Sequence, residues 1–260
     1  MCSSIANGST FQVLLDDLQD PQLSKYRLDL PEYSFYPFAQ LYTMYWGKGN
    51  RYLKHAKPFI PLPLKLIPGD KLYCFGQYSY MEQRIDAFRE YHRITSGGSG
   101  IPPGLALIGS PGIGELVLSH LFKNLNNFSG KTSFLLYYLV REFAHAQPTA
   151  FFIHPLFYVF TEEGVHIMRK LPRFGSAWKF MTCLVDADPL HPPPSYLMME
   201  SGLFVLAVSS TGLDHHYWVK QRSMSQQFAL NPPTQDELVQ VLVWSFIPFA
   251  LYSRSLVSLI

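Results

Sequence analysis

Apolar residues in this chain form short unbroken runs, separated by helical patterns and turn residues. The runs cover residues 105–109 (LALIG), 149–153 (TAFFI), 179–188 (KFMTCLVDAD) and 203–210 (LFVLAVSS). They lack polar alternation, which is typical of strands buried on both faces of a parallel sheet. Residues 131–143 (KTSFLLYYLVREF) instead predict an apolar helix with a charged end. The order predicts an α/β fold, with a mostly parallel sheet and flanking helices.

Two further segments have recognisable patterns. Residues 80–92 (YMEQRIDAFREYH) place Met81, Ile85 and Phe88 at helical spacing, so we expect a helix there. Residues 157–168 (FYVFTEEGVHIM) predict a hairpin of two strands joined by a turn.

Residues 1–79 differ in texture from the rest of the chain. They are rich in aromatic residues and proline, and they predict an irregular N-terminal segment. The α/β pattern occupies residues 80–240, and residues 241–260 form an apolar C-terminal tail. The tail is shorter than the run of about 18 apolar residues that a membrane helix requires, because Ser245 and Pro248 interrupt it. We therefore expect no membrane span.

Charge and cysteine content narrow the possible partners and compartments. The chain has 21 Lys and Arg against 19 Asp and Glu, which gives no electrostatic evidence for nucleic-acid binding. Its 3 cysteines lack CxxC spacing, so neither a disulfide framework nor a zinc site is expected. The N-terminus has no basic segment followed by an apolar one, so no classical signal peptide is expected. These features favour an intracellular protein, cytoplasmic or nuclear, whose protein partner is unknown.

A phosphate-binding motif is present in two separated pieces. A P-loop (Walker A motif) has the pattern GxxxxGK[ST] between a strand and a helix. Residues 109–114 (GSPGIG) supply its first part after a predicted strand, but Glu115 follows where lysine belongs. The sequence GKT then opens the apolar helix, and without residues 115–130 the chain reads GSPGIGKTS. The candidate nucleotide-binding residues are Gly109, Ser110, Pro111, Gly112, Ile113, Gly114, Gly130, Lys131 and Thr132.

The insertion 115–130 has a physical consequence for this motif. In an intact P-loop, backbone amides cradle the phosphates, the lysine reaches the β- and γ-phosphates, and the hydroxyl binds Mg²⁺. If the insertion were helical, it would carry Lys131 about 24 Å along its axis. Lys131 and Thr132 would return to the site only if the insertion looped out entirely. We therefore expect impaired ATP and Mg²⁺ binding, and an ATPase only if the motif is intact.

The second half of a nucleotide site is predicted at residues 181–188. There an apolar run ends on Asp186 and Asp188, as in a Walker B motif. Asp186 would orient Mg²⁺ together with Thr132, and Asp188 would polarise an attacking water. The alternative is an acidic turn at the end of a strand. Ser209 and Ser210 end the next apolar run, either near the γ-phosphate or as caps of the following turn.

Other candidate residues have simpler explanations. His215 and His216 lack a partner at metal-ligand spacing and predict a solvated turn. Lys220 and Arg222 would face either a phosphate or solvent from a helix surface. The glycines of residues 109–114 also spell GxxGxG, which would suit a dinucleotide-binding oxidoreductase. That alternative leaves GKTS unexplained and lacks an acidic residue about 20 positions later.

The order of motifs over residues 81–238 resembles that of the crinkler and retrotransposon-hot-spot type P-loop ATPases, which are frequent in fungi, oomycetes and trypanosomes. The matching segments are MEQRIDAFREYH, GSPGIG with GKTSFLLYYLV, FYVFTEEGVHIM, CLVDAD, LFVLAVSS, YWVKQR and ALNPPTQDEL. The resemblance implies that Lys131 and Thr132 bind phosphate and Mg²⁺, and that Asp186 is the Walker B acid. It also implies ATP hydrolysis coupled to an effector or nucleic-acid-related role, often nuclear or host-directed.

The chain departs from this family pattern at the insertion 115–130 and at the tail 241–260. At both places the residues can be encoded by codons that contain intron splice-site sequences. The residues flanking the insertion 115–130 are encodable by intron donor and acceptor sequences, and Gln240–Val241 by a second donor. We hypothesise that residues 115–130 and 241–260 are translated intron sequence, and hence that the protein is truncated. The expected function is an ATP-binding P-loop module. The alternatives are a non-enzymatic interaction protein on a degenerate P-loop fold and a dinucleotide-binding oxidoreductase.

Overall fold

The structure is a computed structural model, and its description is restricted to part of the chain. The described residues are 32–49, 59–63, 71–95, 101–109, 130–171, 181–187, 192–199, 201–209, 222, 225–231, 234–237 and 239–240.

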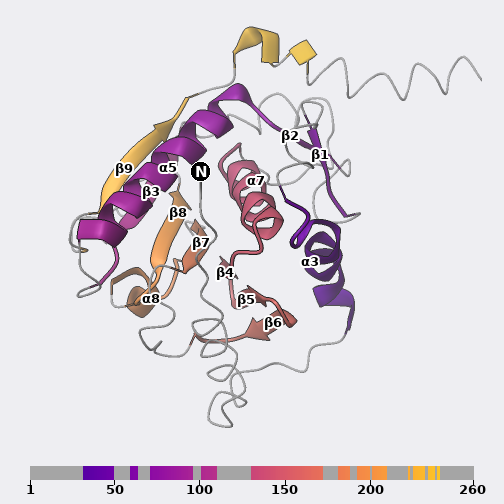
Figure 1. The fold of residues 1–260 in the computed structure, drawn as a ribbon, viewed down its shortest axis with the longest axis vertical. Helices are drawn as coiled ribbons and strands as arrows, with labels where there is room; N and C mark the ends of the chain where they lie inside the picture. The colour runs from indigo at the N-terminus through magenta and orange to yellow at the C-terminus, as the bar shows by residue number, and fades with distance from the viewer. Residues whose placement is uncertain are drawn as a thin grey trace, which may run out of the picture.

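A mostly parallel sheet forms the centre of the molecule (Figure 1). Within the described residues it has 7 strands in the order β6-β5-β4-β7-β8-β3-β9. Strands β4, β7, β8, β3 and β9 run parallel to one another, while β5 and β6 extend the sheet as an antiparallel hairpin. The strands are β3 (Gly104–Gly109), β4 (Thr149–Ile153), β5 (Leu156–Thr161), β6 (Gly164–Met168), β7 (Thr182–Ala187), β8 (Phe204–Ser209) and β9 (Gln226–Leu230). The predicted α/β class and the predicted hairpin are confirmed.

Helices cover both faces of this sheet. The helices are α3 (Glu32–Tyr45), α5 (Gly76–Thr95), α7 (Gly130–Ala144) and α8 (Ser195–Met199). Side chains alternate along each strand. Leu184 and Leu206 therefore pack in one apolar cluster with α3, α5 and α7. Cys183 and Val205 pack in a second cluster with α8. Burial on both faces explains why the strands appear in the sequence as continuous apolar runs.

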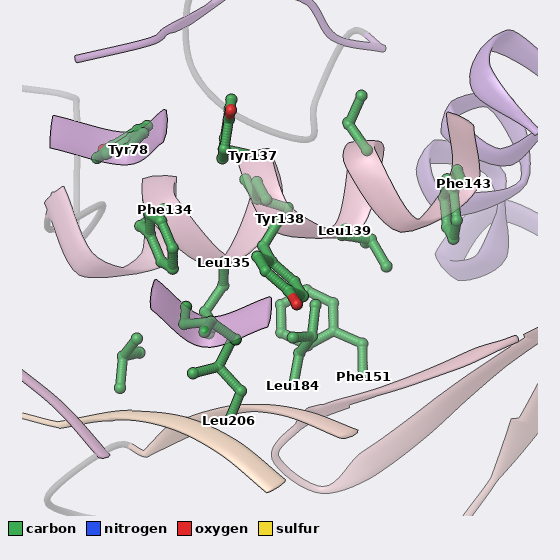
Figure 2. Close-up of a cluster of buried hydrophobic side chains, with 14 of the residues drawn as sticks. Tyr78, Phe134, Leu135, Tyr137, Tyr138, Leu139, Phe143, Phe151, Leu184 and Leu206 are labelled. Carbon is green, nitrogen blue, oxygen red and sulfur yellow. The ribbon is translucent and has the colours of Figure 1, made fainter. Parts of the chain in front are cut away.

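Helix α7 lies at the centre of the larger cluster (Figure 2). Leu135 and Leu139 point from α7 toward the sheet, and Tyr138 and Phe143 are completely buried. This helix is predicted by its apolar spacing. Helix α5 is also predicted, although it begins at Gly76 rather than near residue 80.

The N-terminal segment, predicted to be irregular, contains regular structure. It includes α3 and the antiparallel pair of β1 (Phe59–Pro61) and β2 (Lys71–Tyr73). The Tyr42 hydroxyl donates to the Thr161 carbonyl at 2.7 Å, which joins α3 to the β5–β6 hairpin. The aromatic side chains that predict no periodic element are used for packing against α7 and the sheet.

The loop after α3 caps the C-terminal end of α7. The amides of Gly47 and Gly49 donate to the carbonyls of Phe143 and Ala144, each at 2.8 Å. Both glycines have positive φ, 67° and 70°, a conformation that glycine adopts without a steric penalty. The last carbonyls of a helix have no partners inside it, so these amides satisfy α7 from a distant part of the chain.

No helix among the described residues is long and apolar enough to cross a membrane.

Candidate functional site

The carboxyl ends of β3, β8 and β7 lie level with one another at one edge of the sheet. Ile108 pairs with Ser209, and Ser209 pairs with Ala187. With adjacent strands about 4.8 Å apart, the ends of β3 and β7 are separated by about 10 Å. In open α/β sheets, ligands bind outside this edge. Gly109 ends β3 and Asp186 lies near the end of β7, so both candidate residues belong to this edge.

The N-terminal end of α7 reaches the same edge. The Thr132 hydroxyl donates a hydrogen bond to Oδ2 of Asp186 at 2.9 Å. Lys131 precedes it in the first turn, and both side chains are buried, with exposed fractions of 8% and 9%. Helix α7 also packs against β3 and β8. Thus the hydroxyl and the carboxylate predicted to share Mg²⁺ come together from positions 54 residues apart.

The position of α7 bears on the expected effect of the insertion. A helical insertion extending straight from β3 would displace Lys131 by about 24 Å from the glycine loop. Instead, α7 begins at Gly130 and its first turn contacts Asp186, on the edge where β3 ends. Residues 115–129 themselves lie outside the described residues.

One predicted site residue, Ser209, is described by its backbone alone, and several others lie outside the described residues. Ser209 ends β8, at the same level as Ile108 and Ala187, and only its backbone is described. The candidates outside the described residues are Ser110, Pro111, Gly112, Ile113, Gly114, Asp188, Ser210, His215, His216 and Lys220.

Arg222 occupies neither of the positions that the sequence predicts for it. Its side chain is 3% exposed and binds backbone carbonyls at the amino edge of the sheet, far along the strands from Asp186. It donates to the carbonyls of Pro102 (2.7 Å), Met198 (3.2 Å), Ser201 (3.2 Å), Leu197 (3.5 Å) and Leu203. Burial lowers the pKa of Arg222 to about 10, so the group is charged at neutral pH. Its role is structural, because the carbonyls leave its donors occupied.

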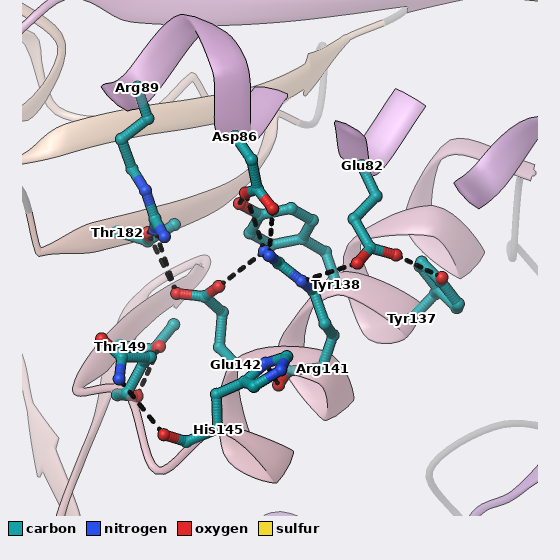
Figure 3. Close-up of polar contacts among 11 residues, drawn as sticks. Glu82, Asp86, Arg89, Tyr137, Tyr138, Arg141, Glu142, His145, Thr149 and Thr182 are labelled. Atoms are coloured by element: carbon teal, nitrogen blue, oxygen red, sulfur yellow. Dashed lines mark hydrogen bonds and ion pairs between the residues drawn. The ribbon is translucent and has the colours of Figure 1, made fainter. Parts of the chain in front are cut away.

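A second polar cluster, which the sequence does not predict, joins α5 to α7 and to the start of β7 (Figure 3). At its centre, Glu142 accepts hydrogen bonds from Arg141 at 2.9 Å and from Arg89 at 3.2 Å. Arg89 also donates to the Thr182 hydroxyl at 2.7 Å, and that hydroxyl donates to Glu142 at 3.3 Å. We call Arg89, Glu142 and Thr182 the amino-edge node.

Arg141 extends the contacts of this node along α5. It donates to Asp86 and forms an ion pair with Glu82 at 2.9 Å, while the Tyr137 hydroxyl donates to Glu82 at 2.5 Å. Burial alone would lower the pKa of Arg141, but the charges around it outweigh burial and raise its pKa. In the sequence, the one sign of this cluster is the charged pair Arg141 and Glu142 at the end of an otherwise apolar helix.

The predicted Mg²⁺ site has suitable donor groups. Mg²⁺ in nucleotide sites takes one or two protein oxygens, phosphate oxygens and waters. The Thr132 hydroxyl and the Asp186 carboxylate are two such oxygens in hydrogen-bond contact. Among the described residues no cluster of three or more His, Cys, Asp or Glu could hold a metal by itself. The Thr132 and Asp186 oxygens fit the one or two protein oxygens that Mg²⁺ takes in nucleotide sites.

Comparison of the chain with protein-family models, curated proteins and solved structures finds no match. The family resemblance therefore depends on the order of the motifs alone.

Proposed function

We propose that the chain is a P-loop nucleotide-binding module that takes ATP with Mg²⁺ at the carboxyl edge of its sheet. The observation that carries the proposal is the 2.9 Å hydrogen bond between Thr132 and Asp186. A hydroxyl at the start of a helix and a carboxylate at the end of a buried strand are the two protein groups that hold Mg²⁺ in P-loop proteins. Membership of the crinkler and retrotransposon-hot-spot type family is part of the same proposal.

The order of elements around this pair supports it. Strand β3 ends in the GSPGIG segment, and α7 opens with Gly130, Lys131 and Thr132. Backbone amides at a helix N-terminus, together with the positive end of the helix dipole, favour a bound phosphate. Lys131 would contact the β- and γ-phosphates, Thr132 and Asp186 would hold Mg²⁺, and Asp188 would lie beside the attacking water.

Thermal melting with and without Mg·ATP tests this assignment. A ligand that binds only the folded state at 100 times its Kd stabilises that state by about 2.7 kcal/mol. We expect Mg·ATP to raise the midpoint temperature of the wild-type chain, and Lys131→Ala to abolish the rise. Lys170→Ala is the matched control, because Lys170 lies after β6 and stacks on Tyr196 at 5.4 Å. A rise that survives Lys131→Ala, or a response to NADPH in place of Mg·ATP, overturns the proposal.

The insertion sets the expected strength of binding. Deleting residues 115–130 restores an uninterrupted GSPGIGKTS, so we expect the deletion variant to bind Mg·ATP more tightly than the full chain. Sequencing the mature transcript across codons 109–135 shows which of the two forms is made. Absence of codons 115–130 would make the uninterrupted form the one to assay as an ATPase. If neither form binds Mg·ATP, the chain is not a nucleotide-binding module.

A further inference from the structure

Hydrogen bonds join α7 to β7 at both ends of the segment over which the helix packs on the strand. At the carboxyl edge, Thr132 donates to Asp186 at 2.9 Å. At the amino edge, Thr182 donates to Glu142 at 3.3 Å. The buried polar residues of this helix–strand pair thus stand at its two ends, and Glu142 and Thr182 are each only 1% exposed.

The spacing of these residues matches the geometry of both elements. Thr132, Leu135, Leu139 and Glu142 recur at intervals of three and four residues, so they share one face of α7. Ten residues of helix span about 15 Å. Along β7, Thr182 and Asp186 are four residues apart on one face, which spans about 13 Å. The two lengths agree closely enough for both polar contacts to form in a single register.

The apolar contacts between the two ends define that register less sharply than the polar contacts do. Leu135 and Leu139 point toward the part of the sheet that carries Leu184 (Figure 2). Apolar burial is not directional, so small shifts of the helix along its axis change its free energy less steeply than that of a hydrogen bond. Hydrogen bonds weaken steeply with distance and angle, so they do not tolerate such shifts.

Arg89 ties a third element into the amino-edge node. It donates to both the Thr182 hydroxyl and the Glu142 carboxylate from α5 (Figure 3). Burial alone would lower the pKa of Arg89, but the surrounding charges, that of Glu142 foremost, more than offset this and raise its pKa. The node is therefore a charged contact among α5 before β3, α7 after it, and β7, the strand that carries Asp186 near its end.

We propose that the amino-edge node is a positioning device for the nucleotide site. Glu142 and Thr182 fix the axial position of α7 on β7, and this position determines where Thr132 and Lys131 stand at the opposite edge. The node acts through the helix at a distance of about 15 Å and does not contact the ligand. This inference rests on the proposed function for its ligand, but its mechanical part is testable without a ligand.

Thr182→Val is the most selective test, because it removes the hydroxyl that links β7 to the node and leaves both ion pairs of Glu142 in place. We expect the Kd of Mg·ATP, measured by calorimetry, to rise by up to about tenfold, the lower limit of the loss when a group directly bonded to a metal ligand is removed. Binding of ATP without Mg²⁺ should change less, because the Thr132–Asp186 pair acts on the cation. Thr182→Ser keeps the hydroxyl and should restore the wild-type Kd.

Val159→Ala provides the control for lost stability. Val159 is buried on the other face of the sheet in β5, away from α7, and truncating it destabilises the fold without touching the node. We expect its Kd for Mg·ATP to stay within twofold of wild type, at a midpoint temperature lowered at least as far as in Thr182→Val. If Thr182→Val and Val159→Ala give the same Kd, the positioning role is wrong.

A cycle of stability measurements tests the same inference if the wild-type chain binds no Mg·ATP. Thr132→Val and Thr182→Val alter opposite ends of the shared register. Sites this far apart normally have additive effects. If α7 transmits the register, releasing one end already weakens the other, and the double variant should lose less than the sum of the two single losses in midpoint temperature. Additive losses would overturn the positioning device, whatever the chain binds.

Discussion

The two edges of the main sheet place polar side chains in different surroundings. At the amino edge, Arg222 and the amino-edge node bond to carbonyls, carboxylates and hydroxyls of the protein itself. At the carboxyl edge, Lys131 and Thr132 open α7 and Asp186 lies near the end of β7, with the Thr132 hydroxyl bonded to the Asp186 carboxylate. The contacts at the amino edge hold helices and strands in place, because each polar group is bonded to another part of the chain. The residues at the carboxyl edge carry the kinds of polar group that bind phosphate and Mg²⁺. Substitutions of Arg222 at the first edge and of Thr132 at the second should therefore separate stability from binding.

The largest loss of stability is expected from Arg222→Leu. The variant leaves buried carbonyls, including those of Pro102 and Leu203, without their donor. We expect the free energy of unfolding, measured in urea, to fall by about 3–5 kcal/mol. Arg93→Leu is the matched control, because Arg93 pairs with Glu90 where both side chains are 53% exposed. That control should cost no more than about 1 kcal/mol. Equal losses in the two variants would contradict a structural role specific to Arg222.

Thr132→Val should have the opposite effect, with little loss of stability and a large loss of Mg·ATP binding. It removes one hydrogen bond to Asp186, so we expect the free energy of unfolding to fall by only about 1 kcal/mol. Mg·ATP binding, however, should be lost almost completely, since the hydroxyl is a proposed Mg²⁺ ligand. Urea titration and calorimetry on the same preparation check the two halves. A large loss of stability with unchanged binding would mean that Thr132, like Arg222, has a structural role.

The smallest effect is expected at Glu237, which links the start of α5 to Thr234. Its carboxylate accepts from the Gly76 amide at 2.7 Å and from the Thr234 amide at 2.8 Å. Burial acts to raise the pKa of Glu237, but these hydrogen bonds outweigh it and lower the pKa below its ordinary value of 4.5. A depressed carboxyl pKa adds stability above the unfolded-state pKa, and this stability is lost as the pH falls through the folded-state pKa.

Glu237→Gln tests that dependence. At pH 7 the variant should melt slightly below the wild type. The difference should shrink as the pH falls below about 4.5, because the wild-type carboxyl then also becomes neutral. Melting curves of both proteins from pH 7 to pH 3 make the comparison. A difference that stays constant over this range would mean that the charge of Glu237 contributes nothing.

The elements that the sequence predicts are those whose signal is local. The buried strands of residues 105–109, 149–153 and 203–210 are predicted because each is an unbroken apolar run. Strand β9 was not predicted, because it opens with Gln226 and Gln227 and alternates in burial. A five-residue strand of that kind resembles a loop until its pairing with β3 is known.

The candidate site shows the same limit. Lys131 and Thr132 are candidates because a P-loop is a local pattern, and Asp186 is a candidate because an apolar run ends there. The roles of Arg222 and Glu142 depend on partners that are distant in the sequence: Arg222 binds Pro102 across 120 residues, and Glu142 binds Arg89 across 53. No periodic or motif signal reports such a pairing, so a lone charged residue near an apolar segment looks like a solvated one.

The contacts of α3 also imply a delay during synthesis, because α3 is made well before the strands it contacts. Tyr42 bonds to the carbonyls of Thr161 and Glu162, the second lying 120 residues further along the chain. At about 5–20 residues per second, a ribosome needs on the order of 6–24 s to make the intervening chain. The aromatic face of α3 must therefore wait, unpaired, while its partners are translated. During this interval the apolar side chains of α3 that later pack against α7 and the sheet lack the partners that bury them.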